Sequence, residues 1–217
     1  MKNKELLESY CTNNSSEEPL YLQELSKCTW LNTTNPRMLT GHLQGRLLSM
    51  LSKLVQPNLV IEIGTFTGYG ALCFAEGLAE KGKVKSIEVN PEHAYKAQEF
   101  IKKTPFANQI QVLNLDGMKF LEDTEELADI IYVDGEKRSY IKYLDACNRV
   151  LRVGGLAIFD NTLWGGKVVQ DSMDRDTEMM KYFNQALVRQ VNFETLQLPL
   201  RDGVTLNFRA RVPKANA

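Results

Sequence analysis

Short runs rich in β-branched residues alternate with amphipathic stretches from residue 59 onward, and this alternation constrains the fold more than any other feature. The runs are Leu59–Ile63, Val84–Val89, Ile110–Leu115, Ile130–Val133 and Leu156–Phe159. Strands that alternate with helical stretches predict βαβ units and a parallel, doubly wound α/β sheet. Ligands bind such sheets beyond the carboxyl ends of the strands, so we expect the functional residues at the ends of these runs.

Further elements are predicted on both sides of this core. Before the first run, apolar residues recur at helical spacing and Pro57 ends the pattern, which predicts N-terminal helices over residues 1–56. After the fifth run come a Gly-rich loop, a helix over about 174–190, and two strands, Phe193–Leu198 and Val204–Arg211, joined by a turn at Pro199–Gly203. These strands predict a C-terminal antiparallel hairpin on a seven-stranded, mostly parallel sheet. We expect one domain over residues 1–217, with its core at 57–212.

Charge and cysteine content argue against several kinds of partner. The 217 residues include 26 Lys plus Arg and 27 Asp plus Glu, so the net charge of −1 gives no overall attraction to nucleic acid or to an acidic membrane. The four cysteines neither pair as Cys-x-x-Cys nor cluster with the two histidines, which argues against a thiolate metal site. No apolar run has the length of a signal peptide or a membrane span. We therefore expect a soluble cytoplasmic protein with reduced thiols.

The segment Glu62–Gly70 follows the first run and has the glycines of a ligand-binding loop. Gly64 and Gly68 allow the backbone to pass close to a ligand, although a tight turn without a ligand is the alternative. Three residues separate these glycines, so the Gly-x-Gly-x-x-Gly pattern that docks a pyrophosphate is absent. Glu62 ends the strand, where its carboxylate can bind a cationic amino-acid head group or order the loop amides. The loop thus indicates a nucleoside-type cofactor without a pyrophosphate.

Acidic residues also follow the second and third runs. Glu88 can accept two hydrogen bonds from a ribose diol, as acidic residues do at this place in nucleotide-binding folds. The alternative for Glu88 is a favourable charge at the N-terminus of the helix that begins near Pro91. Asp116 and Gly117 offer a carboxylate or a backbone amide to an adenine edge, and an N-cap role explains Asp116 almost equally well.

Hard oxygen donors follow the fourth and fifth runs. Asp134 ends the fourth, Asp160 and Asn161 end the fifth, and adjacent parallel strands bring these side chains to one edge of the sheet. Two carboxylates and an amide oxygen suit Mg²⁺, with Mn²⁺ or Ca²⁺ as alternatives, better than zinc. Lys137 lies beside them, where a nearby cation would disfavour its charged form and allow it to act as a general base. Each acid alone could instead cap a helix.

Three motifs together strongly resemble the cation-dependent O-methyltransferases, the catechol and caffeoyl-CoA O-methyltransferase family. The resemblance runs from about Arg37 to Arg209 and implies a Rossmann-like class I methyltransferase fold. The motifs are Ile-Glu-Ile-Gly-Thr-Phe-Thr-Gly-Tyr at 61–69, Val-Asp-Gly-Glu-Lys at 133–137 and Phe-Asp-Asn-Thr-Leu-Trp-Gly-Gly at 159–166. This sequence departs from the family pattern at three positions. Gly70 stands where Ser is usual, Gly117 where Ala is usual, and Glu136 replaces a small residue or Asp.

The resemblance implies a role for each matched residue. Asp134, Asp160 and Asn161 would hold the divalent cation, Lys137 would take the proton from the accepting hydroxyl, and Asp134 would also face the methyl donor. Trp164 would wall the acceptor pocket or pin its loop, and Lys167 is either an anchor for an anionic substrate tail or a solvated lysine. The cofactor, S-adenosylmethionine, would be lined by Met38, Thr40, Glu62, Gly64, Thr65, Phe66, Gly68, Tyr69, Gly70, Glu88, Asp116, Gly117 and Asp134.

The resemblance implies methyl transfer to a hydroxyl of a catechol-like or phenolic small molecule by a homodimeric enzyme. The main alternative keeps the cofactor and cation but methylates a hydroxylated uridine in transfer RNA, which would require a basic rim around the pocket. A nicotinamide-dependent oxidoreductase is a third interpretation, disfavoured by the glycine spacing and by the lack of a suitable Tyr-x-x-x-Lys. A catalytically silent cofactor-binding protein is a fourth, disfavoured by the intact set of predicted cation ligands.

Overall fold

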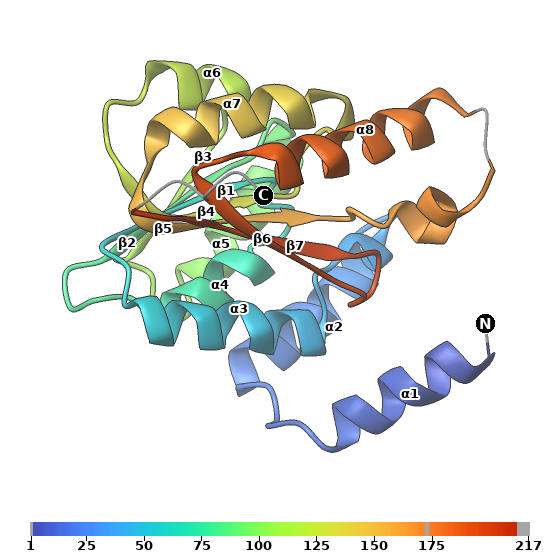
Figure 1. Cartoon of the computed structure of the whole chain (residues 1–217). Helices are drawn as coiled ribbons and strands as arrows, with labels where there is room; N and C mark the ends of the chain where they lie inside the picture. Colours follow the sequence, from blue (N-terminus) through green and yellow to red (C-terminus); the bar gives the residue numbers. More distant parts are fainter. Residues whose placement is uncertain (1, 172–173, 212–217) are drawn as a thin grey trace.

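The computed structural model describes residues 2–171 and 174–211, and a seven-stranded sheet forms its centre. The strand order is β3-β2-β1-β4-β5-β7-β6 (Figure 1). Neighbouring strands from β3 to β5 pair in parallel, whereas β7 pairs antiparallel with both β5 and β6. The predicted α/β class, strand number and terminal hairpin are confirmed. The strands are β1 (Leu59–Ile63), β2 (Lys83–Ile87), β3 (Ile110–Leu113), β4 (Ala128–Val133), β5 (Leu151–Asp160), β6 (Phe193–Leu198) and β7 (Val204–Arg209).

Helices cover both faces of this sheet. In Figure 1, α3, α4 and α5 lie on one side of the sheet, and α6, α7 and α8 lie on the other. The α-helices are α1 (Lys2–Asn13), α2 (Leu20–Asn32), α3 (His42–Val55), α4 (Tyr69–Ala75), α5 (Pro91–Ile101), α6 (Gly117–Asp123), α7 (Tyr140–Val150) and α8 (Arg175–Arg189). Three short 3₁₀ segments occur at Pro36–Met38, Lys137–Ser139 and Trp164–Val169. The predicted N-terminal helices are therefore α1, α2 and α3.

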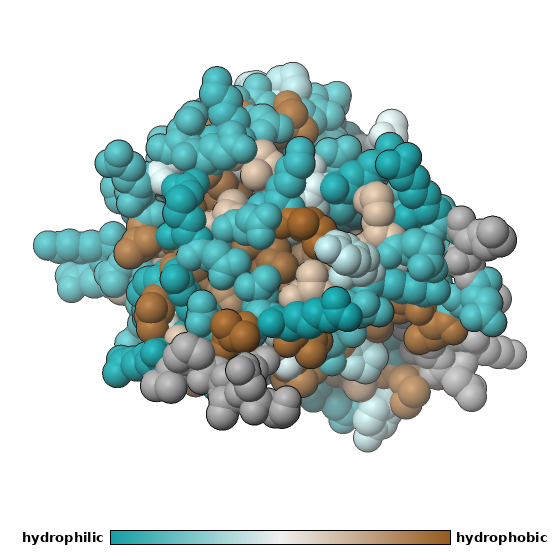
Figure 2. Space-filling view, turned by 45° about the horizontal axis from the view of Figure 1, so that its top comes forward, coloured by the Kyte–Doolittle hydropathy of each residue, from teal (hydrophilic) through white to brown (hydrophobic). Residues whose placement is uncertain are grey.

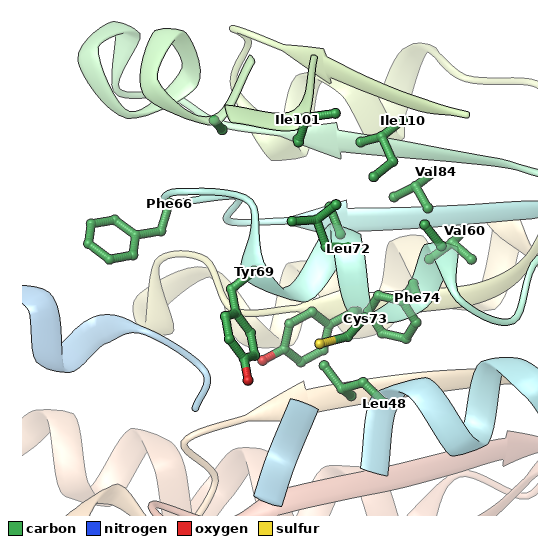
Figure 3. Close-up of a cluster of buried hydrophobic side chains, with 14 of the residues drawn as sticks. Leu48, Val60, Phe66, Tyr69, Leu72, Cys73, Phe74, Val84, Ile101 and Ile110 are labelled. Carbon is green, nitrogen blue, oxygen red and sulfur yellow. The ribbon is translucent and has the colours of Figure 1, made fainter. Parts of the chain in front are cut away.

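The core consists of two apolar clusters, one on each face of the sheet. Val60 packs with Leu48 of α3 and Phe74 of α4, whereas its neighbour Ile61 belongs to the cluster with Phe183 of α8. Figure 3 shows the first cluster, in which Leu72 and Phe74 of α4 face the strands. Successive strand residues point to opposite faces, and because both faces are covered, the central strands β1 and β4 are mainly apolar.

Two strands differ from the predicted bounds in ways that affect the site. Strand β5 begins at Leu151 rather than Leu156, and its pairing with β4 is irregular near Ala128 and Ile130. Gly154 has a φ of 78°, as residues at β-bulges often do. Glycine is unfavourable inside strands, so the sequence did not predict that the strand extends across this position. Strand β2 ends at Ile87, so Glu88 is the first residue beyond the strand instead of a member of it.

Exposed hydrophobic side chains occur at several places on the surface, the N-terminal helix among them. In Figure 1, helix α1 extends away from the other elements, and its Leu6, Leu7 and Tyr10 are exposed. The face formed by α6, α7 and α8 is mainly hydrophilic, with hydrophobic residues in short groups (Figure 2). Within residues 2–171 and 174–211, no helix is long and apolar enough to cross a bilayer. All four cysteines are free, two of them buried and two exposed.

Candidate active site

A cavity of about 770 Å³ opens at the carboxyl ends of the parallel strands, where the sequence predicts the site. The residues that follow β1, β2, β4 and β5 line it, together with segment 35–38 and the β6–β7 turn at Arg201 and Asp202. The predicted site residues that line it are Met38, Gly64, Phe66, Glu88, Asp116, Gly117, Asp134, Lys137, Asp160 and Asn161.

The loop after β1 approaches the end of β4 so closely that only glycine fits at its first position. Gly64 has a φ of 99°, and a Cβ atom there would lie 2.5 Å from the carbonyl oxygen of Asp134. The Gly64 amide donates to the carbonyl of Ile87 at 2.9 Å, which joins the loop to β2. Gly68, with a φ of 95°, is the N-cap residue of α4 and has a left-handed conformation. The glycine spacing therefore brings this loop against two strand ends.

Glu88 joins the loop after β1 to the segment after β2. Its Oε2 accepts from the Phe66 amide at 2.8 Å, and its Oε1 accepts from the Asn90 amide at 2.9 Å. His93 lies nearby, with its ring edge-to-face against Phe66 and its Nδ1 4.0 Å from Glu88 Oε1. Two of the roughly four acceptor positions of the carboxylate are occupied by these amides, so further positions remain for hydroxyl donors.

The structure places Asp116 at the N-cap of α6. Its Oδ1 accepts from the Lys119 amide at 2.8 Å, so the capping alternative accounts for this carboxylate. The adjacent Gly117 lies against β1, because a Cβ atom there would be 2.5 Å from Cγ2 of Ile63. Both residues also line the cavity.

Several residues that the sequence assigns to the cofactor do not line the cavity. Glu62 is buried and accepts from the Ser86 hydroxyl. The pKa of Glu62 is raised to about 8, mainly because the carboxyl is buried. The hydrogen bond from Ser86 lowers this pKa, whereas the charges of Asp134 and Glu88 raise it further. Figure 3 shows Phe66 extending from the loop and Tyr69 pointing toward α3. The residues outside the lining are Thr40, Glu62, Thr65, Gly68, Tyr69 and Gly70.

The space beside Glu62 explains the departure at Gly70. A Cβ atom at position 70 would collide with the Glu62 carboxylate, so the serine that is usual in the family would force that side chain to move. The Tyr69 hydroxyl donates to Glu18, in the segment between α1 and α2. These contacts join the loop to β2 and to the N-terminal segment.

Asp134 and Lys137 form an ion pair in the cavity wall. Lys137 Nζ lies 2.6 Å from Asp134 Oδ1, and both side chains are a little over one-fifth exposed. Burial raises the pKa of the Asp134 carboxyl; the Lys137 ammonium lowers it, and the charge of Asp160 raises it. The Arg201 guanidinium, which also lines the cavity, lowers the pKa of Asp134 as well, so two carboxylates and two cationic side chains meet at this edge of the sheet.

Asp160 is held by residues that sequence reasoning missed. Its Oδ2 accepts from Gln44 Nε2 and from the Tyr132 hydroxyl, both at 2.7 Å, and its Oδ1 accepts from the Asn161 amide at 2.7 Å. The Tyr140 hydroxyl donates to the Asp160 carbonyl at 2.9 Å. A glutamine within the apolar pattern of α3 is the only sequence signal for this contact, and its side chain is buried.

Trp164 lies in a second cavity of about 180 Å³ beside the first. Lys137 and Glu136 line both cavities, and Met179 and Met180 of α8 line the smaller one. Trp164 Nε1 is buried and has no hydrogen-bond partner among the described residues. Lys167, for which the sequence left open a substrate anchor or a solvated lysine, lies 4.0 Å from Asp174.

Arg201 fixes the segment that borders the cavity near the N-terminal helices. Its guanidinium donates to the carbonyls of Leu39 and Thr40, and to that of Arg37 at 3.3 Å. Arg37 and Met38 line the cavity, so this turn residue holds part of the cavity wall. No sequence pattern indicates this role, because the partners are backbone carbonyls on a distant segment.

Comparison with known proteins agrees with this geometry. A family model described as O-methyltransferase matches residues 12–210. The chain belongs to the O-methyltransferase family. A caffeoyl-CoA O-methyltransferase of Stellaria longipes is 31% identical to this methyltransferase over 217 residues, covering 93% of this chain and 89% of the relative.

Solved structures resemble the methyltransferase in fold. An SAH-bound methyltransferase of Podospora anserina has a TM-score of 0.87 at 22% identity, covering 97% of this chain and 96% of the other. An O-methyltransferase of Bacillus cereus in complex with SAH has a TM-score of 0.84 at 22% identity, covering 94% and 97%. The Rossmann-like methyltransferase fold expected from the motifs is therefore confirmed.

The methyltransferase has no cluster of three His, Cys, Asp or Glu side chains suited to a metal within the residues that the structure describes. The predicted ligands are two carboxylates and the Asn161 amide, so they fall outside such a cluster. Asp134, Asp160 and Asn161 nevertheless line one cavity, and the Asn161 side chain makes no hydrogen bond to another described residue. All three offer hard oxygen atoms, which are the ligands that suit a divalent cation such as Mg²⁺.

Proposed function

We propose that this methyltransferase transfers the methyl group of S-adenosylmethionine to a hydroxyl of a catechol-like or phenolic small molecule, with the aid of a divalent cation. The observation that carries the proposal is the position of Lys137, which borders both cavities and lies 2.6 Å from Asp134. A base at this boundary can reach a hydroxyl in the smaller cavity while the methyl donor occupies the larger one.

The larger cavity supports a nucleoside-type methyl donor. Its volume of about 770 Å³ is within the range of small-molecule sites. Glu88 is positioned to accept from ribose hydroxyls, Gly117 offers a backbone amide to the adenine, and Met38 borders the methionine end. The relatives crystallised with SAH, which is S-adenosylmethionine without its methyl group, support the same choice.

The donor set supports a divalent cation held by Asp134, Asp160 and Asn161. When bound, such a cation lowers the pKa of a coordinated hydroxyl and orients two neighbouring oxygens of a diol. Lys137, acting as a neutral amine, accepts the hydroxyl proton, the acceptor oxygen forms a bond to the methyl carbon, and the carbon–sulfur bond breaks, which releases SAH. The walls of the two cavities would hold the acceptor oxygen, the methyl carbon and the sulfur in line. Such positioning makes a bimolecular reaction effectively unimolecular.

The smaller cavity supports an aromatic acceptor. Trp164 gives a flat apolar wall with a buried N–H that lacks a partner among the described residues, and Met179 and Met180 can adapt to rings of different shape. A phenolic oxygen would satisfy the Trp164 donor.

An acceptor screen tests the proposal. The purified chain is incubated with S-adenosylmethionine and Mg²⁺ plus catechols, caffeoyl thioesters, flavonoids or bulk transfer RNA, and methylated products are measured by mass spectrometry. We expect transfer to at least one small diol, and loss of transfer when a chelator removes the cation. Retained cofactor binding without transfer to any small phenol would contradict the proposal, and methylated transfer RNA would support the alternative.

A further inference from the structure

The carboxylate of Asp160 is more constrained than that of Asp134. Oδ2 accepts from two side chains, Gln44 and Tyr132, each at 2.7 Å. Oδ1 accepts only from the Asn161 amide, at 2.7 Å, among the residues that the structure describes. A carboxylate oxygen has two lone-pair positions, so Oδ2 is fully used and Oδ1 keeps one position open.

Gln44 is committed to this arrangement with both of its amide hydrogens. Its Nε2 donates to Asp160 Oδ2 and also to the Tyr132 hydroxyl, at 3.1 Å. The three side chains therefore form a closed triangle, and each is at most 4% exposed. Breaking one contact would leave a buried polar group without a partner, which makes the triangle resistant to rearrangement.

The helices hold the triangle in place. Gly45, next to Gln44, allows α3 to approach α4 closely, since a Cβ atom there would lie 2.6 Å from the Tyr69 ring. The Tyr132 ring packs against Phe74 of α4, with 5.6 Å between ring centroids. Gln44 also lines the larger cavity. The clamp on Asp160 is thus built from α3 and β4 and borders the proposed cation site.

We propose that Gln44 and Tyr132 are positioning residues that leave Asp160 a single free lone pair, on Oδ1, and so make it a one-oxygen ligand that favours Mg²⁺ or Mn²⁺ over Ca²⁺. The inference rests on the proposed function, because it concerns the cation assigned there. Mg²⁺ requires a compact octahedron of single oxygen atoms, whereas Ca²⁺ takes six to eight oxygens and often binds both oxygens of a carboxylate. A carboxylate with one oxygen blocked suits the smaller ion.

Cation binding to the full chain tests the inference without relying on activity. Binding of Mn²⁺ alone is measured by electron paramagnetic resonance, and Mg²⁺ or Ca²⁺ is then added as a competitor. Gln44→Leu removes both donors at similar volume, and Tyr132→Phe removes one. Gln98→Leu is the matched control, because Nε2 of Gln98, on α5, donates to the Val112 carbonyl of β3 and neither residue lines the cavity.

We expect Gln44→Leu to weaken Mn²⁺ binding about tenfold, as loss of a residue that orients a metal ligand does. The preference for Mg²⁺ over Ca²⁺ should fall at least about threefold. Tyr132→Phe should also lower the Mn²⁺ affinity and the preference for Mg²⁺ over Ca²⁺. If Gln44→Leu does not fold, Tyr132→Phe alone tests the inference. Gln98→Leu should leave both unchanged.

The outcomes separate this inference from the proposed function. If the wild-type chain binds Mn²⁺ and Asp160→Asn abolishes that binding, the cation site holds. Unchanged affinity and selectivity in folded Gln44→Leu and Tyr132→Phe would then overturn the clamp alone. A wild-type chain that binds no Mn²⁺ would refute the cation site and the clamp together.

Discussion

Replacing Glu76 by Gln should destabilise the contact between α3 and α4 by about 2 kcal/mol at pH 7. Glu76 follows α4, and its carboxylate accepts from Arg46 at 2.6 and 2.9 Å, from Ser49 at 2.7 Å and from Lys53 at 3.0 Å, all on α3. The Glu76 side chain is 8% exposed. Because α3 carries Gln44, this cluster also helps to place the site.

The magnitude follows from the pKa of Glu76. Burial alone would raise that pKa, but the hydrogen bonds from Arg46, Ser49 and Lys53 outweigh burial and lower it from 4.5 to about 2. A difference of about 2.5 pKa units corresponds to roughly 3 kcal/mol. We reduce this to about 2 kcal/mol because Lys53 is 53% exposed and its contribution is screened by solvent.

The sign of the pH dependence is fixed by the lowered pKa. The folded state holds the proton less tightly than the unfolded state, so the stabilisation is present above about pH 4.5 and is lost as the pH falls toward 2. Urea denaturation of the wild type and Glu76→Gln at pH 7 and pH 3 measures this difference. At pH 7 the melting temperature should fall by about 4–8 °C.

A surface glutamate provides the control for this substitution. Glu99 makes an exposed pair with Lys102 at 2.6 Å, so Glu99→Gln should give no measurable change in stability. If Glu76→Gln matches the wild type at pH 7, or if its deficit is the same at pH 3, the charge of this carboxylate does not hold the two helices together.

Three further substitutions test the site. Lys137→Met should lower kcat by about 10²–10⁴-fold while S-adenosylmethionine binding is retained. The control, Lys142→Met at an exposed position, should leave kcat unchanged. Equal losses of kcat in both variants would exclude Lys137 as the base. Arg201→Met should weaken cofactor binding by about tenfold in calorimetry, because a lost charged hydrogen bond costs about 1.5 kcal/mol or more, and unchanged affinity would argue against its role in the cavity wall. Gly64→Ala should lower the free energy of unfolding by at least about 2 kcal/mol, measured by urea denaturation. The reason is that position 64 has a positive φ and that the added Cβ would collide with the Asp134 carbonyl. A variant as stable as the wild type would contradict that geometry.

Local sequence patterns were sufficient to predict the sheet, the cavity edge and most of the residues around it. Strand positions follow from β-branched runs and turns from glycine chemistry, both of which are encoded within a few neighbouring residues. Gly64, Asp134 and Asp160 could therefore be placed at the same edge from the order of the strands alone. The motifs also predicted the family that the comparisons confirmed.

Long-range packing, in contrast, determines which side chains line the cavity and which do not. Glu62 and Tyr69 belong to the predicted loop, yet both are buried and neither lines the cavity, because the direction of a side chain depends on the helices packed against it. Gln44 meets Asp160 across 116 positions, and Arg201 meets Leu39 across 162. No local pattern encodes such contacts, since they exist only once α3 and the β6–β7 turn have packed at the end of the sheet.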